Sequence, residues 1–246
     1  MKLATLYFTF LFCLSASSQD NGYIATYSYE FLISEEFLNK PNKTDTDKYL
    51  LKLDDKTKKA AKHIEIQLHI KGPESYAFLT PSMDIDNLSL KSAVVASGHR
   101  QPIYSNSKTE KVFRPNSESI FPKNSYIISH PSLTTEWTLS QEQKIINGYL
   151  CYKAIGVLSK TVNGKKKEFN SIAWYTPSIP LYFGPLGYGK LPGLIVQLTV
   201  IDKKYSLKSI KEVSEDMIEI IQPNDGEIVT NEEYQELVKK AIKRKI

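Results

Sequence analysis

The sequence predicts a mainly β protein: a large curled antiparallel sheet, or half-open barrel, with one amphipathic helix at its C-terminus. Three observations support this. Short runs rich in Tyr, Ile, Val and Phe follow one another through most of the 246 residues. Tight turn sequences join several of them, as in β-hairpins. Only the last segment has clear helical spacing. Because about ten successive strands exceed what a flat sheet usually carries, the sheet is expected to curl on itself.

The N-terminal 18 residues have the pattern of a secretory signal peptide. A basic start precedes about a dozen apolar residues, and the small residues Ala16 and Ser18 stand where cleavage before Gln19 is expected. No later stretch reaches the roughly 20 apolar residues that a membrane span needs. The chain is therefore expected to be exported, to the periplasm, the outer membrane or the exterior. Residues 19–246 are expected to form a single domain.

Charge and cysteine content narrow the possible functions. The formal net charge is only +5, and basic residues gather in the runs 56–62, 165–167 and 239–245. A nucleic-acid-binding domain would be more basic, with interleaved aromatic residues, so no nucleic-acid partner is expected. Cys13 lies in the signal segment, where lipidation is a weaker alternative because the large Phe12 precedes it. Cys151 alone then remains, and it is predicted to be a buried thiol in a strand.

The predicted strands rest on alternation and turn signals. Residues 63–71 alternate most clearly, with Ile64, Ile66, Leu68 and Ile70 on one face. Asn163-Gly164 and Lys203-Lys204 are predicted to turn two hairpins. Residues 102–106 and 111–114 are expected to be short edge strands. The predicted strands are 22–34, 63–71, 75–80, 102–106, 111–114, 124–130, 133–140, 148–160, 166–176, 193–202, 205–212 and 217–222.

The predicted helices are fewer. Residues 230–245 combine Thr230 and Glu233 in a capping box with apolar residues at helical spacing, acids early and lysines late. Residues 82–95 are expected to contain one short helix. For residues 47–61 the pattern leaves a strand and a helix equally open.

The chain is organised around residues 173–200, which hold four of the twelve prolines and four of the eleven glycines. Proline fixes φ and glycine permits positive φ, so this stretch is neither a helix nor one strand. It is predicted to be a strand at 172–176, a shaped crossing, and a strand at 193–201. Its apolar residues are expected to anchor the crossing in the core. The structural residues of the motif are Pro180, Gly184, Pro185, Leu191, Pro192, Gly193, Leu194 and Ile195.

The hexapeptide KLPGLI at residues 190–195, preceded by AWYTPSIP and FGP, resembles the signature of the GLPGLI family of extracytoplasmic Bacteroidota proteins. The likeness extends upstream through Trp137 and residues 144–154. Lys190 stands where the family has its first glycine, so Gly189 is the candidate for a positive-φ turn there. The family has no established activity, and the resemblance implies an exported β protein rather than a reaction.

Residues with chemical potential are few. Aromatic residues around the crossing could line a binding groove, since amphipathic rings bind at small entropic cost; core packing is the alternative for them. His63 and His69 lie about 20 Å apart on an extended strand, so they cannot share a metal. No catalytic, metal or cofactor site is predicted. The candidate binding residues are Trp174, Tyr175, Tyr182, Phe183 and Tyr188.

The favoured hypothesis is a non-enzymatic exported cell-envelope protein. It would bind an apolar or peptide ligand, a lipid or an envelope protein partner through the curled sheet. One alternative is an exported hydrolase or peptide-processing enzyme, with His99 or His130 as base and a serine or Cys151 as nucleophile. Another is a structural accessory of an outer-membrane transport system that docks through the crossing.

Overall fold

The structure is a computed structural model that describes residues 21–32, 39, 41–80, 88–130, 136–162 and 165–243, excluding the side chains of 46–50, 52–54 and 158–162 and 165–167. The predicted signal peptide, the Asn163-Gly164 turn and residues 82–87 lie outside this part. Its helices are α2 (Asp45–Ala61), α3 (Leu88–Ala96) and α4 (Asn231–Lys243). Its strands are β1 (Asn21–Phe31), β2 (Glu65–Lys71), β3 (Glu74–Leu79), β4 (Ile103–Asn106), β5 (Lys111–Pro115), β6 (Tyr126–Ser129), β7 (Trp137–Ile146), β8 (Tyr149–Val162), β9 (Lys165–Thr176), β10 (Leu194–Val200), β11 (Lys203–Ser214) and β12 (Glu227–Thr230).

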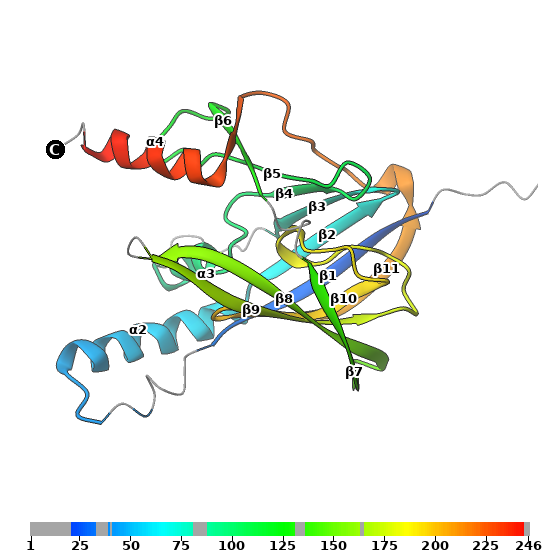
Figure 1. The fold of residues 1–246 in the computed structure, drawn as a ribbon, viewed down its shortest axis with the longest axis horizontal. Coiled ribbons are helices and arrows are strands. Elements are labelled where there is room, and N and C mark those ends of the chain that lie inside the picture. The colour runs from blue at the N-terminus through cyan, green and yellow to red at the C-terminus, as the bar shows by residue number, and fades with distance from the viewer. Residues whose placement is uncertain are drawn as a thin grey trace, which may run out of the picture.

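The strands form one 12-stranded sheet in the order β12-β6-β5-β4-β3-β2-β1-β11-β10-β9-β8-β7. The sheet is open, with β7 and β12 at its two ends, and it curls so that β4–β6 and β7–β9 lie on opposite sides of the middle strands (Figure 1). The predicted mainly β, curled architecture with a C-terminal helix is therefore confirmed. Neighbouring strands pair antiparallel except β12 and β6, whose parallel pairing the sequence did not predict.

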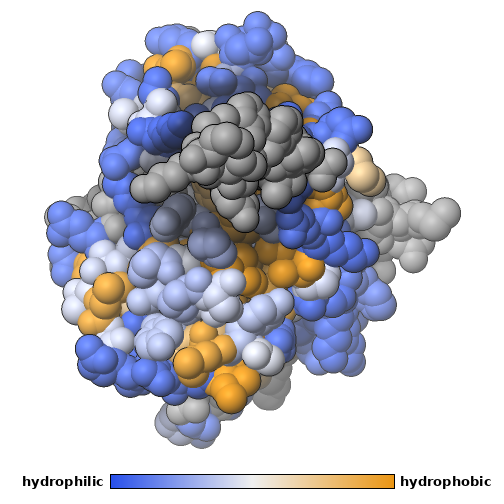
Figure 2. All heavy atoms as spheres, turned by 90° about the vertical axis from the view of Figure 1, so that its right-hand side faces the viewer, coloured by the Kyte–Doolittle hydropathy of each residue, from blue (hydrophilic) through white to orange (hydrophobic). Residues whose placement is uncertain are grey.

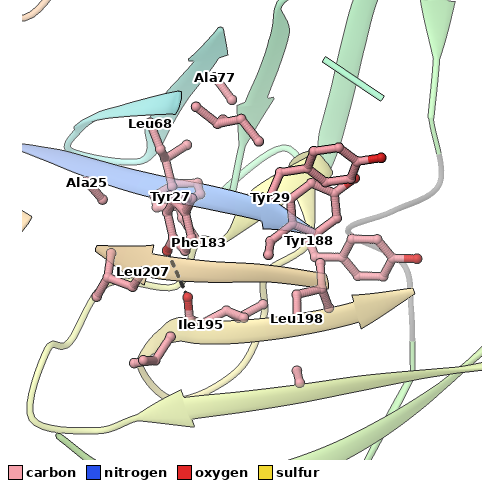
Figure 3. Packing of buried hydrophobic residues seen from close by; sticks show 14 of the residues in the cluster. Ala25, Tyr27, Tyr29, Leu68, Ala77, Phe183, Tyr188, Ile195, Leu198 and Leu207 are labelled. Atoms are coloured by element: carbon pink, nitrogen blue, oxygen red, sulfur yellow. Dashed lines mark hydrogen bonds between the residues drawn. The ribbon is translucent and has the colours of Figure 1, made fainter. Parts of the chain in front are cut away.

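The inner face of the curl carries the main core. Along the strands, alternate residues point inward, which is why β2 shows a strict alternation of buried and half-buried side chains. Residues 177–193, here called the clasp, pack onto this face. Figure 3 shows Phe183 and Tyr188 of the clasp beside Tyr27 and Tyr29 of β1. The inner face of the curl is thus lined by packed apolar side chains.

The helices complete the fold. Residues 47–61, which the sequence left open, lie in the helix α2, with an Asp55–Lys59 ion pair of 2.8 Å one turn apart. The capping box at the start of α4 is confirmed. The Glu233 amide donates to Thr230 Oγ1 at 3.2 Å, and the Thr230 amide donates to Glu233 Oε2 at 2.7 Å.

Several boundaries differ from the predictions. The strand predicted at 217–222 is wrong: residues 215–217 form a 3-10 turn and the following segment pairs with no strand. The last strand is β12, just before the C-terminal helix, where no strand was predicted. The hairpin turn of β10 and β11 lies at Ile201-Asp202 rather than Lys203-Lys204. The strands at 103–106 and 111–115 are interior, because β6 and β12 extend the sheet beyond them.

Candidate functional site

The clasp is held in the curl by backbone hydrogen bonds to the next strand. The Leu194 amide donates to the Ile179 carbonyl at 2.9 Å, and the Ile195 amide donates to that of Phe183 at 3.1 Å. From the other side, Trp137 Nε1 of β7 donates to the Gly189 carbonyl at 2.9 Å. The Tyr27 hydroxyl donates to the Ile195 carbonyl at 2.8 Å, as drawn in Figure 3. The clasp is therefore an integral part of the core.

Gly193 shows why the motif needs a glycine at the end of the clasp. Its φ is +146°, and a Cβ built there would lie 2.0 Å from the Thr176 carbonyl oxygen. No side chain fits such an approach of two backbones. Gly193 therefore allows β10 to begin directly against the end of β9.

Lys190 itself adopts positive φ, +63°, so the expectation that Gly189 supplies this turn is wrong. The left-handed conformation costs a non-glycine residue about 1–2 kcal/mol, whereas glycine adopts it freely. The Lys190 side chain forms an ion pair of 2.8 Å with Glu110, which offsets part of this cost. This ion pair connects the clasp to the β4–β5 turn.

We expect Lys190→Gly to raise the free energy of unfolding by about 0.5–1 kcal/mol, because relief of strain exceeds the loss of an exposed ion pair. Chemical denaturation measures the change. Glu110→Gln is the matched control, since it removes the ion pair and keeps the backbone. A Lys190→Gly variant less stable than Glu110→Gln would contradict the strain argument.

The structure does not bring the five predicted binding aromatics into one groove. Tyr175, Phe183 and Tyr188 are buried in the main core, and the Tyr188 hydroxyl lies 3.4 Å from Ser171 Oγ. Tyr182 is 52% exposed. Trp174 lies on the outer face of β9, because its neighbour Tyr175 points inward. Core packing, the alternative stated for these residues, describes the three buried rings, and Trp174 packs partly buried against the same core.

The structural residues of the motif divide by exposure. Leu191, Leu194 and Ile195 are buried in the main core, as are Gly184, Pro185 and Gly193. Pro180 and Pro192 are exposed at the surface of the clasp. Docking of a partner through Leu194 is therefore impossible without unfolding the clasp.

Trp174 is already engaged on the outer face. Lys144 Nζ lies 4.0 Å from the centre of its indole ring and donates to Gln197 Oε1 at 3.1 Å. A cation over an aromatic face is attracted by the ring quadrupole. Partial burial lowers the pKa of Lys144. This contact ties β7 to β9 and β10 across the sheet.

The two histidines of the hydrolase hypothesis contact neither a hydroxyl nor a thiol through their rings, within the described residues. His99 is buried; its Nδ1 donates to the Ser97 carbonyl at 3.1 Å, and its Nε2 accepts from the Leu186 amide at 3.4 Å. His130 Nε2 accepts from Arg114 Nε at 2.6 Å. Cys151 is buried, and burial raises the pKa of its thiol. No base-activated nucleophile is formed from these residues.

A pocket of about 330 Å³ lies elsewhere, on the outer face of β2 and β3. His69 and Tyr76 stand opposite each other in the β2–β3 ladder, and both point away from the main core. Tyr76 packs there against a second cluster, formed by Tyr104, Phe113 and Ile127. The His69 ring meets Phe78 edge-on at 4.9 Å between centroids. The segment after β11 crosses this face, where the Glu219 carbonyl lies 3.4 Å from His69 Nδ1. The lining residues are His69, Tyr76, Phe78, Leu79, His99, Arg100, Pro102, Glu219 and Ile221.

The pocket combines aromatic walls with charged groups at its edge. Tyr76 and Phe78 rings lie 5.6 Å apart, and Arg100 and Glu219 are exposed beside them. Burial, and then the Glu219 charge, raise the pKa of Tyr76. His99 connects the pocket to the clasp, because it lines the pocket and accepts from Leu186. Apolar faces with few convergent polar groups are typical of ligand sites.

The pocket was not predicted, although the sequence holds a signal for it. Tyr76 and Phe78 occupy outward positions of β3, where a strand with a solvated face carries polar residues. Glu219 and Ile221 form the other wall of the pocket, and they were predicted to lie in a strand of the sheet. On the face drawn in Figure 2, hydrophobic residues form separate groups among hydrophilic ones, as on most protein surfaces.

No group of three or more His, Cys, Asp and Glu side chains in the described residues is arranged to hold a metal ion. None of the helices in that same part is both long and apolar enough to cross a membrane.

Part of the chain matches a known family. Residues 158–197 match the family described as "Protein of unknown function (Porph_ging)". The matched segment runs from β8 through β9 and the clasp into β10, and so it includes the proline- and glycine-rich motif. No curated protein matches the chain.

The solved structures similar to this chain include two described as "Structure of PNGF-II in P21 space group" and "Structure of PNGF-II in C2 space group". Each is 16% identical to this chain, with TM-scores of 0.48 and 0.49. The matches cover 90% of this chain but 34% and 33% of those chains. This chain thus spans about a third of their length.

Proposed function

We propose that this protein is a non-enzymatic exported cell-envelope protein of the GLPGLI type that binds an apolar or peptide ligand. The signal-peptide pattern and the KLPGLI motif support the location and the family. The site that we propose is the outer-face pocket, defined by its nine lining residues, rather than the clasp. The observation that carries the proposal is the aromatic pair Tyr76 and Phe78 lining a pocket of about 330 Å³.

The pocket suits one or two apolar side chains of an extended peptide. Its volume is at the lower end of the range for ligand sites, about 300–1,000 Å³. Tyr76, Phe78 and His69 supply ring surface that is half-buried before a ligand arrives. Arg100 at the edge is available to pair with a carboxylate of the peptide, and Glu219 with a basic group. This arrangement favours a short amphipathic segment over a wholly apolar lipid chain.

We expect Phe78→Ala to weaken binding of the best ligand from an envelope peptide pool at least tenfold, because burying an aromatic ring contributes about 1.5–3 kcal/mol. Titration calorimetry with the full chain measures the affinity, and circular dichroism checks that the variant is folded.

Tyr182→Ala is the matched control, since it removes an exposed ring from the clasp. Wild-type affinity in this control, with loss in Phe78→Ala, supports the outer-face pocket. Loss of affinity in Tyr182→Ala, with wild-type affinity in Phe78→Ala, would indicate that the ligand binds at the clasp. A folded wild-type protein that binds no member of the pool would count against the proposed function altogether.

A further inference from the structure

Arg114 lies on the inner face of β5, between the clasp and α4. Val112, two residues earlier, points the same way, and a Cβ on Gly187 of the clasp would lie 2.6 Å from it. On the other side, Ile128 of β6 stands opposite Arg114 in the ladder and packs against Tyr234 of α4. Arg114 therefore occupies the stretch of inner face between two apolar clusters.

The charge of Arg114 has no counter-charge in the part of the chain that the structure describes. The side chain is half-buried, and no carboxylate there forms an ion pair with it. Its Nε donates to His130 Nε2 at 2.6 Å. Burial, and then the Arg114 charge itself, lower the pKa of His130 to about 3, so this acceptor is neutral. It is unusual for a half-buried guanidinium to donate only to a neutral group, because buried charges are normally paired with an opposite charge.

Tyr234 of α4 carries a polar group without a hydrogen-bond partner. Its hydroxyl is buried and has no hydrogen-bond partner among the described residues. Buried tyrosine hydroxyls usually find one. Tyr234 packs in one cluster with Ile128, the ladder neighbour of Arg114. An uncompensated cation and an unused hydroxyl donor therefore flank the same residue, Ile128 of β6.

We propose that Arg114 and Tyr234 bind an oxyanion, a carboxylate or phosphate group of a small ligand, on the inner face of the sheet. Arginine carries five N–H donors in a planar fork, of which Nε and one group on Nη2 are directed to His130. The remaining groups can donate in the paired geometry that carboxylates and phosphates accept. Arg114 and His130 both remain partly exposed, so a ligand can reach them. This site is separate from the outer-face pocket.

Thermal unfolding of the full chain tests the proposal, with sodium phosphate and sodium acetate as separate probes and sodium chloride at equal ionic strength as reference. We expect at least one oxyanion to raise the melting temperature above the chloride reference. Arg114→Gln is expected to weaken the apparent affinity at least about tenfold. Lys211→Gln is the matched control, since it removes an exposed positive charge on β11 that belongs to neither site. It should keep the wild-type response.

Tyr234→Phe provides a second test that does not depend on the folding of Arg114→Gln. It removes only an unpaired hydroxyl, so the variant should fold, and we expect it to weaken the oxyanion response several-fold. The ring signals of His130 in nuclear magnetic resonance spectra should shift on titration in the wild type and not in Arg114→Gln. A phosphate-only or acetate-only response identifies the group that is bound. No response beyond chloride, or equal responses in the wild type and both variants, would overturn the proposal.

Discussion

Replacement of Leu194 by Asp is expected to unfold most of the protein at room temperature. Leu194 has no exposed surface and belongs to the main core, where the clasp joins β10. The variant loses about 1.5–3 kcal/mol of apolar burial and leaves an unpaired carboxylate inside, which costs about 3–5 kcal/mol more. Their sum is comparable to the whole stability of a typical domain, about 5–15 kcal/mol. Circular dichroism and chemical denaturation measure the loss.

Two variants make this prediction specific. Leu194→Ala should cost only about 2–5 kcal/mol, because it leaves a cavity without a charge. Ile145→Asp adds the same charge on the edge strand β7, where Ile145 is 75% exposed, and should change stability by less than about 0.5 kcal/mol. A Leu194→Asp protein with the wild-type melting temperature would show that the clasp does not pack on the sheet.

Acidification is expected to destabilise the protein well above the pH at which most carboxylates are protonated. Burial lowers the pKa of His99 to about 4 and that of His130 to about 3, against an ordinary value of 6.5. A histidine with a lowered folded pKa is protonated first in the unfolded chain, so stability falls as the pH falls below 6.5. From pH 7 to pH 5 each histidine should cost about 2 kcal/mol, about 4 kcal/mol together.

Denaturation curves between pH 7 and pH 5 check this expectation. The His99→Gln variant removes one of the two protonation sites and should show about half of the pH dependence. Arg114→Gln should reduce the contribution of His130 to the pH dependence without abolishing it. Burial is the larger cause of the lowered His130 pKa, and repulsion by the guanidinium is the smaller one. A free energy of unfolding that does not change over this range would mean that neither ring is buried in the folded protein.

The strands of the curl were largely predictable because their information is local. Alternation over residues 63–71 reports which side chains face the core, and it placed β2 to within two residues. The capping box of Thr230 and Glu233 likewise involves residues three apart, so the start of α4 needs no tertiary information. A proline and glycine cluster predicts an irregular crossing wherever it packs.

Errors arose where a distant partner decides the conformation. β12 is a strand because it pairs in parallel with β6, about a hundred residues earlier, and its own four residues carry no sufficient signal. The segment after β11 is extended and apolar in part, but it lies across the outer face of β2 and β3 instead of joining the sheet. Lys190 adopts a backbone conformation that favours glycine because Glu110 and the flanking packing hold it there.

The amino-acid sequence alone is sufficient for the mainly β class, the helical C-terminus and the special role of the clasp, since periodicity and turn chemistry are short-range. Only the folded chain shows which aromatic residues pack in the core and which line a surface pocket. Tyr188 and Phe78 are chemically similar, and their difference lies in what the curl brings against them. The same holds for Arg114, whose lack of a counter-charge follows from long-range packing.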